Sequence, residues 1–154
     1  MFSQTVEYAL RAIVYLAGQK GTRTTQQIAA ATRVPAAYLA KVLQNLSRVE
    51  VVRSQRGLHG GFSLGKSPDE LTMWEVVQAV EPTRRLQSCP LGLDIHRGSL
   101  CALHKKMDDA LAEIENAFRS SSIAGLLAEA EANASPCSFP YVDAPKENGR
   151  IALK

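Results

Sequence analysis

The 154-residue sequence predicts a mainly α-helical protein with one small β-hairpin. Apolar residues recur at helical spacing over most of the chain. Two stretches open with a Thr that has Gln or Glu three residues later, the pattern of a helix-starting capping box. By contrast, the glycine-rich stretch "VVRSQRGLHGGFSL" at 51–64 reads as strand, turn and strand.

The first part of the chain has three predicted helices. Apolar spacing predicts a helix over 3–17, ended by Gly18. Thr24 and Gln27 predict the start of a short second helix, which the break at "RVP" ends. Pro35 suits the first turn of a third helix, which runs to Arg48. This third helix is expected to bury Leu39, Val42, Leu43 and Leu46 and to expose Lys41, Gln44 and Asn45.

Two helices joined by a tight break and followed by a hairpin form the layout of a winged helix-turn-helix. An ordinary helical hairpin is the alternative for the two helices alone, and the hairpin after them favours the DNA-binding layout. The wing carries Arg53, Arg56 and His59. Its glycines allow a sharp turn and a close approach to phosphates.

The charge distribution favours a polyanionic partner. Residues 1–66 hold nine Lys/Arg and two Asp/Glu, a net charge of +7, whereas residues 67–154 have a net charge of −4. No signal peptide or membrane-spanning stretch is visible, which predicts a cytoplasmic protein without a membrane partner. Cysteines are expected to be reduced there, so a metal or redox site is favoured over a structural disulfide.

After the hairpin, the sequence predicts a short helix, a loop, a long helix and a final short helix. Thr72 and Glu75 predict a helix that stops at Pro82, and a loop follows over 83–98. A long helix is predicted over 99–120, then a short one. Six apolar residues of the long helix step by 3, 4, 3, 4 and 3: Leu100, Leu103, Met107, Ala110, Ile114 and Ala117.

This apolar seam would either pack on its own domain or pair two copies. We expect a homodimer, because a small DNA reader gains affinity and specificity from two half-sites. The expected organisation is a winged helix-turn-helix domain over 1–82, a cysteine-containing loop over 83–98, a dimerisation helix with a short C-terminal helix over 99–132, and a flexible tail over 133–154.

The run from Gly60 to Ser67 fits the P-loop pattern G-x-x-x-x-G-K-S. A P-loop needs a buried strand before it and a helix that opens at its Lys-Ser, but Pro68 disfavours helix at Ser67. We therefore interpret the match as a coincidence and predict that the protein is not an enzyme. A P-loop nucleotide-binding enzyme that depends on Lys66 is the remote alternative.

Soft metal ligands gather in "QSCPLGLDIHRGSLCALH" at 87–104. Cys89 and Cys101 lie twelve residues apart, and His104 follows Cys101 by three residues, on the same helical face. His96 lies between the cysteines. Two thiolates with nitrogen or carboxylate ligands can hold a 2Fe–2S cluster or zinc. A redox-active thiol pair and buried cysteines without a ligand role are the alternatives.

Together these stretches resemble the Rrf-two family of bacterial winged-helix transcription regulators, which includes the IscR, NsrR, CymR and RirA types. The wing signature R-G-x-x-G-G-[FY]-x-L is specific for this family. The matching stretches cover about residues 1–127, in order: "EYALRAIVYLA", "TTQQIAAATRVPAAYLAKVLQNL", "VRSQRGLHGGFSL", "LTMWEVVQAVEP" and "CPLG…LCALHKKMDDAL".

The resemblance implies a homodimeric repressor, crossed through the long helix, that binds a partly palindromic operator in double-stranded DNA. The residues implied to face DNA are Tyr38, Lys41 and Gln44 in the third helix and Arg53, Arg56 and His59 in the wing. Gln44 would contact a base edge, and Arg56 would enter or flank the minor groove. Lys41 and Arg53 would bind phosphate.

The resemblance also implies a 2Fe–2S cluster that senses redox state, nitric oxide or iron–sulfur status. Cluster-binding members commonly have three cysteines, and this sequence lacks the middle one. His104 matches the histidine position of IscR-type members. Glu7 matches an acidic ligand that the other subunit would donate, and His96 is an alternative ligand. Zinc is a further alternative, as is a cluster-free regulator or adaptor that responds to thiol oxidation or a partner protein.

Overall fold

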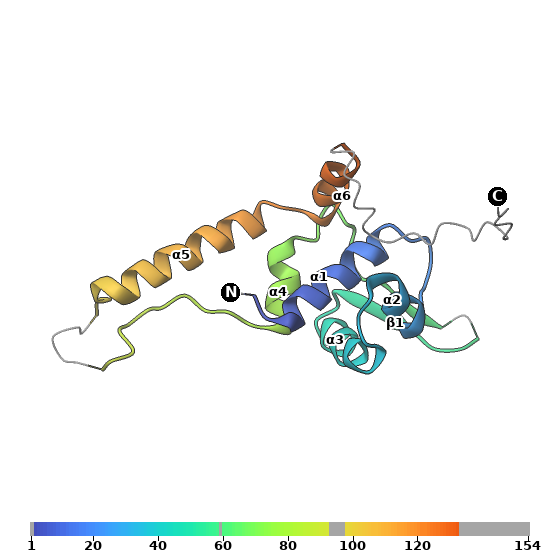
Figure 1. Cartoon of the computed structure of the whole chain (residues 1–154), viewed down its shortest axis with the longest axis horizontal. Helices are drawn as coiled ribbons and strands as arrows, with labels where there is room; N and C mark the ends of the chain where they lie inside the picture. The colour runs from blue at the N-terminus through green and yellow to red at the C-terminus, as the bar shows by residue number, and fades with distance from the viewer. Residues whose placement is uncertain (1, 59, 93–97, 133–154) are drawn as a thin grey trace, which may run out of the picture.

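The computed structural model describes residues 2–58, 60–92 and 98–132. The mainly helical fold with a two-stranded wing predicted from the sequence is confirmed (Figure 1). In chain order, the elements are α1 (Gln4–Ala17), α2 (Thr25–Thr32), α3 (Ala36–Arg48), β1 (Val52–Gln55), β2 (Gly61–Leu64), α4 (Met73–Val80), α5 (Ala102–Arg119) and α6 (Ile123–Ala132). His59, His96 and the tail over 133–154 lie outside the described residues.

Both predicted capping boxes start their helices as expected. In α2, the Thr24 hydroxyl accepts the Gln27 N–H and the Gln27 side chain accepts the Thr24 N–H. Thr72 and Glu75 make the same reciprocal pair at the start of α4. The backbone turns sharply after α2 because Arg33 is left-handed (φ 55°). Chain direction therefore changes within three residues before α3 begins after Pro35.

One main hydrophobic core holds α1 to α4 and the wing together, and a smaller cluster of Val6, Trp74 and Val77 lies between α1 and α4. Helix α1 lies at its centre and packs on α2, α3, α4, α6 and β2. The four apolar residues of α3 that were predicted to be buried are each at most 1% exposed. On the opposite face of α3, Lys41 and Gln44 are exposed as predicted, whereas Asn45 is half-buried. The core therefore fixes which face of α3 is available to a partner.

The wing is an antiparallel hairpin in which Val52 pairs with Leu64 and Gln55 with Gly61. Arg23 adds a short bridge to Phe62, with N–H···O distances of 2.9 and 2.8 Å. Gly61 is needed at this bridge because a Cβ atom there would lie 2.6 Å from the Arg23 carbonyl oxygen.

The P-loop-like run from Gly60 to Ser67 comprises β2 and the turn after it, and no helix opens at its end. Lys66 instead pairs with Glu75 on α4, with Nζ 2.6 Å from the carboxylate. These glycines therefore serve the wing, as interpreted from the sequence.

Helix α5 begins at Ala102, three residues after the predicted start. Cys101 is its N-cap, with extended backbone angles (φ −66°, ψ 164°), and Gly98 turns the chain before it (φ 76°). Leu100 therefore precedes the helix, and its predicted place in the helical seam is wrong. The other five seam positions lie on α5.

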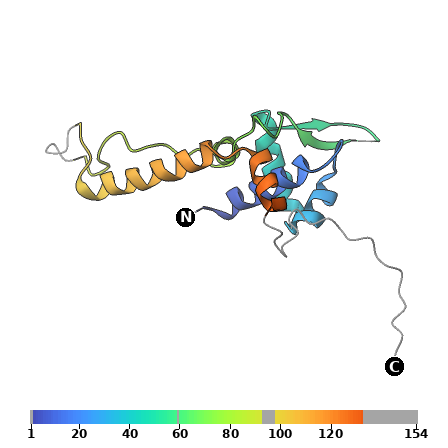
Figure 2. The ribbon, with the colours of Figure 1, turned by 90° about the horizontal axis from the view of Figure 1, so that it is seen from above.

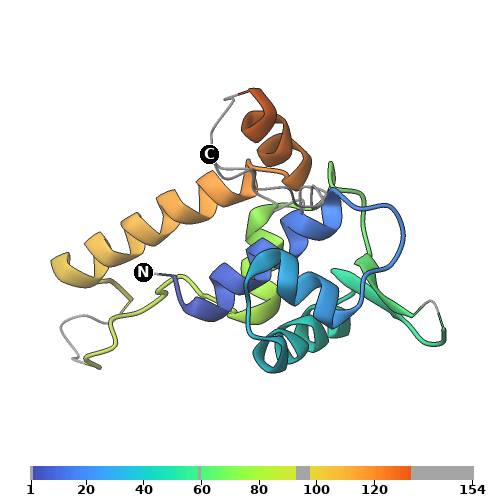
Figure 3. The same cartoon turned by 45° about the vertical axis from the view of Figure 1, so that its right-hand side comes forward.

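The long helix and the loop before it run away from the body together. Figures 1 and 2 show α5 beside the segment 83–92, with the wing on the opposite side of the molecule. The turned view of Figure 3 keeps α6 close to α1, at the inner end of α5. Among the described residues, no helix combines the length and apolar character needed to cross a bilayer.

Candidate metal site and DNA-binding surface

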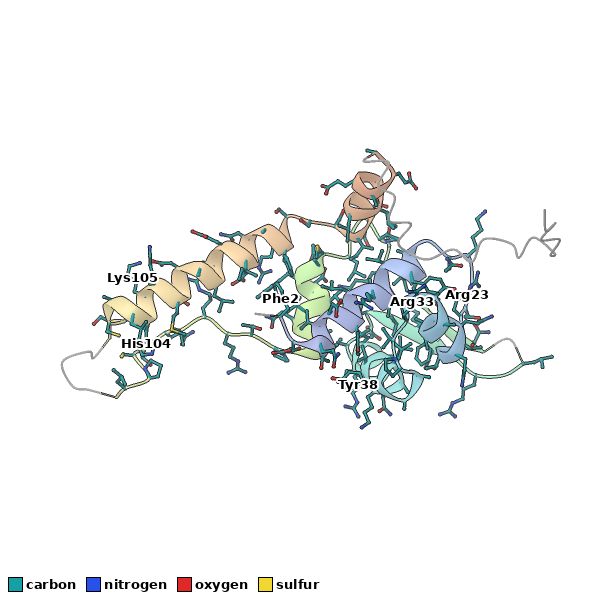
Figure 4. The ribbon with its side chains drawn as sticks, viewed as in Figure 1. Phe2, Arg23, Arg33, Tyr38, His104 and Lys105 are labelled. Carbon is teal, nitrogen blue, oxygen red and sulfur yellow. The ribbon has the colours of Figure 1, made fainter. Side chains whose placement is uncertain are left out.

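The structure brings three predicted metal ligands together. The Sγ atom of Cys101 lies 3.1 Å from Nδ1 of His104, and the Sγ atom of Cys89 lies 3.5 Å from the same nitrogen. The three ligand atoms all lie within 4.8 Å of one another. We call these three residues the Cys–Cys–His site. Figure 4 shows His104 at the outer end of α5, far along the helix from the body that carries Tyr38.

Local backbone structure places each ligand. Cys101 caps α5, so His104 lies one turn further on the same side of the helix. Cys89 comes from the loop, where a turn closes through a hydrogen bond from the Gly92 N–H to the Cys89 carbonyl (3.2 Å). Gly92 suits this turn because its φ is 63°. Cys89 is 7% exposed, so the site is shielded on the loop side.

The start of α5 lowers the pKa of the Cys101 thiol. The main cause is the backbone N–H of His104, which points at the sulfur, and burial opposes it. The Cys89 thiol and the Leu103 N–H lower the pKa further. Cys101 is therefore biased towards the thiolate, the form that binds metals and attacks oxidants.

Two thiolates and one imidazole form a soft donor set that suits zinc or an iron–sulfur cluster. Zinc or a cluster needs a fourth ligand, and the described part of one chain supplies three. Glu7 is exposed and pairs with Arg11 one turn along α1. Its predicted role as a ligand from the other subunit, like that of the undescribed His96, stays a prediction.

Helix α5 carries a second stripe that the sequence analysis missed. Each of its members directly follows a seam residue in the sequence, and none of them is exposed. We call it the inner stripe: Cys101, His104, Asp108, Leu111, Glu115 and Phe118. Its mixed chemistry hides it from a search for apolar periodicity. The available indication was the same 3, 4, 3, 4, 3 spacing, starting from a cysteine.

The inner stripe joins α5 to the rest of its own chain. Near the outer end, Asp108 binds Arg85 and the backbone of Leu86. At the inner end, the Phe118 ring stacks on Phe2, with centroids 4.9 Å apart and planes 11° apart. The loop and the N-terminal segment therefore both depend on α5 for their position.

Lys41 and Gln44 line a shallow hollow of about 350 Å³ between α3 and the wing. Ser54 and Phe62 line it from the wing. Side chains alternate along a strand, so Arg53 points to the opposite face of β1 from Ser54 and away from this hollow. Ser54 was missed by the sequence analysis, although strand alternation from the buried Val52 indicates it.

The other predicted DNA contacts differ in their surroundings. Tyr38 is 38% exposed, its hydroxyl lies 2.5 Å from the Thr5 hydroxyl, and its ring meets the edge of Tyr8 at 5.4 Å. Tyr38 therefore fixes α3 against α1 as well as presenting a polar edge. Arg56 is exposed in the wing turn. His59 lies outside the described residues.

Comparison with known proteins decides the family. A sequence model of the Rrf2 family, described as iron-dependent transcriptional regulators, matches residues 2–129. The chain belongs to the Rrf2 family. An HTH-type transcriptional regulator of Aquifex aeolicus is 32% identical over 142 residues, which cover 90% of this chain and 99% of the relative. The regulator NsrR of Shouchella clausii is 32% identical over 85 residues, 54% of this chain and 57% of NsrR.

Solved structures of Rrf2-type regulators share the fold. IscR of T. potens superimposes with a TM-score of 0.73 at 19% identity, covering 92% of this chain and 96% of IscR. CymR of B. subtilis gives a TM-score of 0.66 at 22% identity, covering 84% and 97%. The chain is thus a DNA-binding winged-helix transcriptional regulator, and its family consists of regulators rather than enzymes.

The lowered pKa of Cys101 predicts its reactivity. In metal-free protein, alkylation of Cys101 should reach half its maximal rate at a pH below 9.0, the ordinary thiol value, because the thiolate reacts. His104→Ala should keep this midpoint low, since the main cause is a backbone N–H. Cys89→Ala should raise it. Mass spectrometry of iodoacetamide-labelled peptides across pH measures this, and a midpoint at 9.0 or above would contradict the assignment.

Proposed function

We propose that this Rrf2 protein is a homodimeric, cytoplasmic repressor of a partly palindromic operator, controlled by a 2Fe–2S cluster in the Cys–Cys–His site. The observation that carries the proposal is the convergence of three soft ligands on the inner stripe of α5. The other long face of α5 is apolar and exposed. One helix would therefore link the sensor to the dimer.

The exposed face of α5 supports the homodimer. Leu103 is 65% exposed, Met107 56% and Ile114 39%, although all three are apolar. Ala110 and Ala117 continue the same line and are also exposed. Small and large apolar side chains at this spacing are typical of a helix that packs against a second helix. A second copy of α5, crossed over the first, would bury them.

The exposed face of α3 and the wing would contact DNA. Gln44 would hydrogen-bond a base edge in the major groove, while Lys41 would bind a phosphate beside it. Arg56 would enter the minor groove, where the potential is most negative. Arg53, on the outer face of β1, would contact the backbone. Two copies of α3 in the dimer would reach two half-sites.

In this proposal, Cys89, Cys101 and His104 would hold the cluster, and Glu7 of the other subunit would complete the ligand set. A bound cluster supplies a redox-active group that oxidants and nitric oxide can destroy. This chain's residues would hold the sulfur ligands as thiolates and shield them from water. Ligation through Glu7 would compete with its pairing to Arg11.

Contacts at the inner end of α5 would connect the site to the DNA reader. Phe118 stacks on Phe2, which directly precedes α1. Helix α1 in turn holds α3 through the contacts of Thr5 and Tyr8 with Tyr38. A shift of α5 would thus change the position of α3 and the spacing between the two recognition helices.

A thiol switch without a cluster is the second candidate function. The observation that favours it is the lowered pKa of Cys101, next to the Cys89 sulfur. An oxidant such as a peroxide would take two electrons from the two thiols. The sulfurs would join as a disulfide, while the two electrons and both thiol protons would reduce the O–O bond of hydrogen peroxide to give two molecules of water. Zinc in the same site is the remaining alternative.

Met107→Glu should weaken the homodimer. A buried Met side chain contributes about 1.5–3 kcal/mol, and a buried carboxylate at the interface adds a desolvation cost. Sedimentation equilibrium of the two proteins measures the dissociation constant. Asn116→Glu, on a face of α5 that neither stripe occupies, is the matched control and should leave it unchanged. Equal dissociation constants for wild type and Met107→Glu would rule out this seam.

Gln44→Ala should reduce discrimination at one operator base pair by about 1–3 kcal/mol, with the unfolding free energy within about 0.5 kcal/mol of wild type. Lys41→Ala should weaken binding to all sequences alike and lower the salt slope of log K by about 1. Lys106→Ala on α5 is the control. Fluorescence anisotropy across salt concentrations measures both, and an equal loss in Lys106→Ala would indicate unspecific charge attraction.

Anaerobically purified wild type should contain iron and absorb light beyond the aromatic band. Cys101→Ala and His104→Ala should lose the iron because each removes a ligand, whereas Cys137→Ala in the tail should retain it. Metal analysis and an ultraviolet–visible spectrum measure this. Zinc without iron would contradict the cluster and support a zinc site. A metal-free wild type would contradict both and support the thiol switch.

A further inference from the structure

The loop that carries Cys89 has no helix or strand of its own over 81–92. Yet it holds the Cys89 sulfur 3.5 Å from a nitrogen on α5. A turn around Cys89 shapes the loop locally but does not fix it to the helix. A contact between the loop and α5 is needed to keep the two parts of the site in register.

Asp108 provides such a contact. Its carboxylate accepts hydrogen bonds from Arg85 Nε (2.7 Å), Arg85 Nη2 (2.5 Å) and the backbone N–H of Leu86 (2.8 Å). The Arg85 fork engages both carboxylate oxygens, the geometry that makes arginine–carboxylate pairs specific. Asp108 is 8% exposed, and among the described residues it is the one charged residue that is buried.

The charge of Asp108 is stabilised where it lies. The Arg85 guanidinium is the main cause that lowers the carboxyl pKa to about 2, with the Leu86 N–H adding to it against the cost of burial. A buried carboxylate without such partners would be strongly unfavourable. Detaching the loop would break these charge-assisted hydrogen bonds, so they stabilise the position of the loop on α5.

The contact of Asp108 with Arg85 and Leu86 is close to the Cys–Cys–His site both along α5 and along the loop. Asp108 follows His104 by four residues, about 6 Å along the helix. Leu86 precedes Cys89 by three residues, at most about 11 Å of extended chain. The loop is thus fixed within a few residues of its ligand, and Cys89 has little freedom to move away from α5.

We propose that Arg85 and Asp108 are positioning residues that latch the loop onto α5 and so hold Cys89 in the Cys–Cys–His site. In this proposal, Arg85 and Asp108 are not ligands themselves. They act on the site only by fixing the position of Cys89. The metal-binding part of this inference rests on the proposed function, whereas the placement of Cys89 does not.

A neighbouring ion pair offers the matched control. Lys105 and Asp109 pair one turn apart within α5, at 2.9 Å. This pair joins no loop to the helix. Asp109→Asn therefore removes the same charge, one residue away and from the same helix, without releasing Cys89.

The first measurement uses the full chain, reduced and metal-free. Asp108→Asn and Arg85→Gln should each raise the iodoacetamide labelling rate of Cys89 and the exchange rate of the Leu86 amide by about 10-fold or more, because local opening exposes both. Asp109→Asn should match wild type in both. Circular dichroism checks that the variants keep their helices. If Asp108→Asn proves unstable, Arg85→Gln alone decides, since its loss leaves the helix sequence intact.

The second measurement uses Co²⁺ as the probe, because its thiolate absorption bands report sulfur ligation. Loss of a group that orients a ligand typically costs about 10–100-fold in metal affinity, and we expect this for Asp108→Asn and Arg85→Gln but not for Asp109→Asn. Unchanged Cys89 labelling and Co²⁺ affinity in both latch variants would overturn the proposal.

The two proposals fail separately. A wild type that binds neither iron nor Co²⁺, with Cys89 released in the latch variants, would refute the metal site and support the latch. A wild type that binds metal, with Cys89 equally protected in all variants, would refute the latch and support the metal site.

Discussion

Neighbouring residues of an α-helix point about 100° apart, and this offset lets α5 serve two surfaces at once. The seam residues such as Met107 point outward and are exposed, while the inner stripe one residue ahead faces the chain's own loop and body. The contacts of α5 with Arg85, Leu86 and Phe2 all come from the inner stripe. The loop, the N-terminal segment and α4 all contact α5. The exposed seam is the surface that the proposed homodimer would cover.

The inner stripe works because its chemistry changes along its length. At the outer end, thiol and imidazole groups lie beside Cys89, and one turn further along α5 the buried carboxylate of Asp108 holds the loop. At the inner end, an aromatic ring stacks on Phe2, and Arg119 beside it lies over the Trp74 ring at 5.7 Å. Soft ligands, charge and aromatic packing thus occupy successive turns. In the proposed mechanism, a change at the metal site would be transmitted along α5 to its inner end, which is packed against Phe2 and Trp74.

Local patterns in the sequence predicted the fold well, because capping boxes, the break before Pro35 and the wing glycines act over a few residues. Cys101 and His104 were predicted together for the same reason, since helical geometry sets their separation. The pairing of Arg85 with Asp108 spans 23 residues across an irregular loop, and no periodicity encodes it. The start of α5 was missed because Cys101 caps the helix with its backbone extended. The proposed fourth ligand, Glu7 of a second copy, would come from another chain, so contacts within one chain cannot reveal it.

The turn at Cys89 and the cap at Cys101 each end a short stretch of chain whose length the Cys–Cys–His site depends on. The contacts of Arg85 with Asp108 and of Cys89 with His104 fix two stretches of chain relative to each other, residues 85–89 and residues 101–108. An insertion or deletion within either stretch would shift Cys89, Cys101 or His104 relative to the contact between Arg85 and Asp108. Both stretches must therefore keep their lengths, since one inserted residue in either would separate Cys89 from Cys101 and His104 even with all three side chains retained.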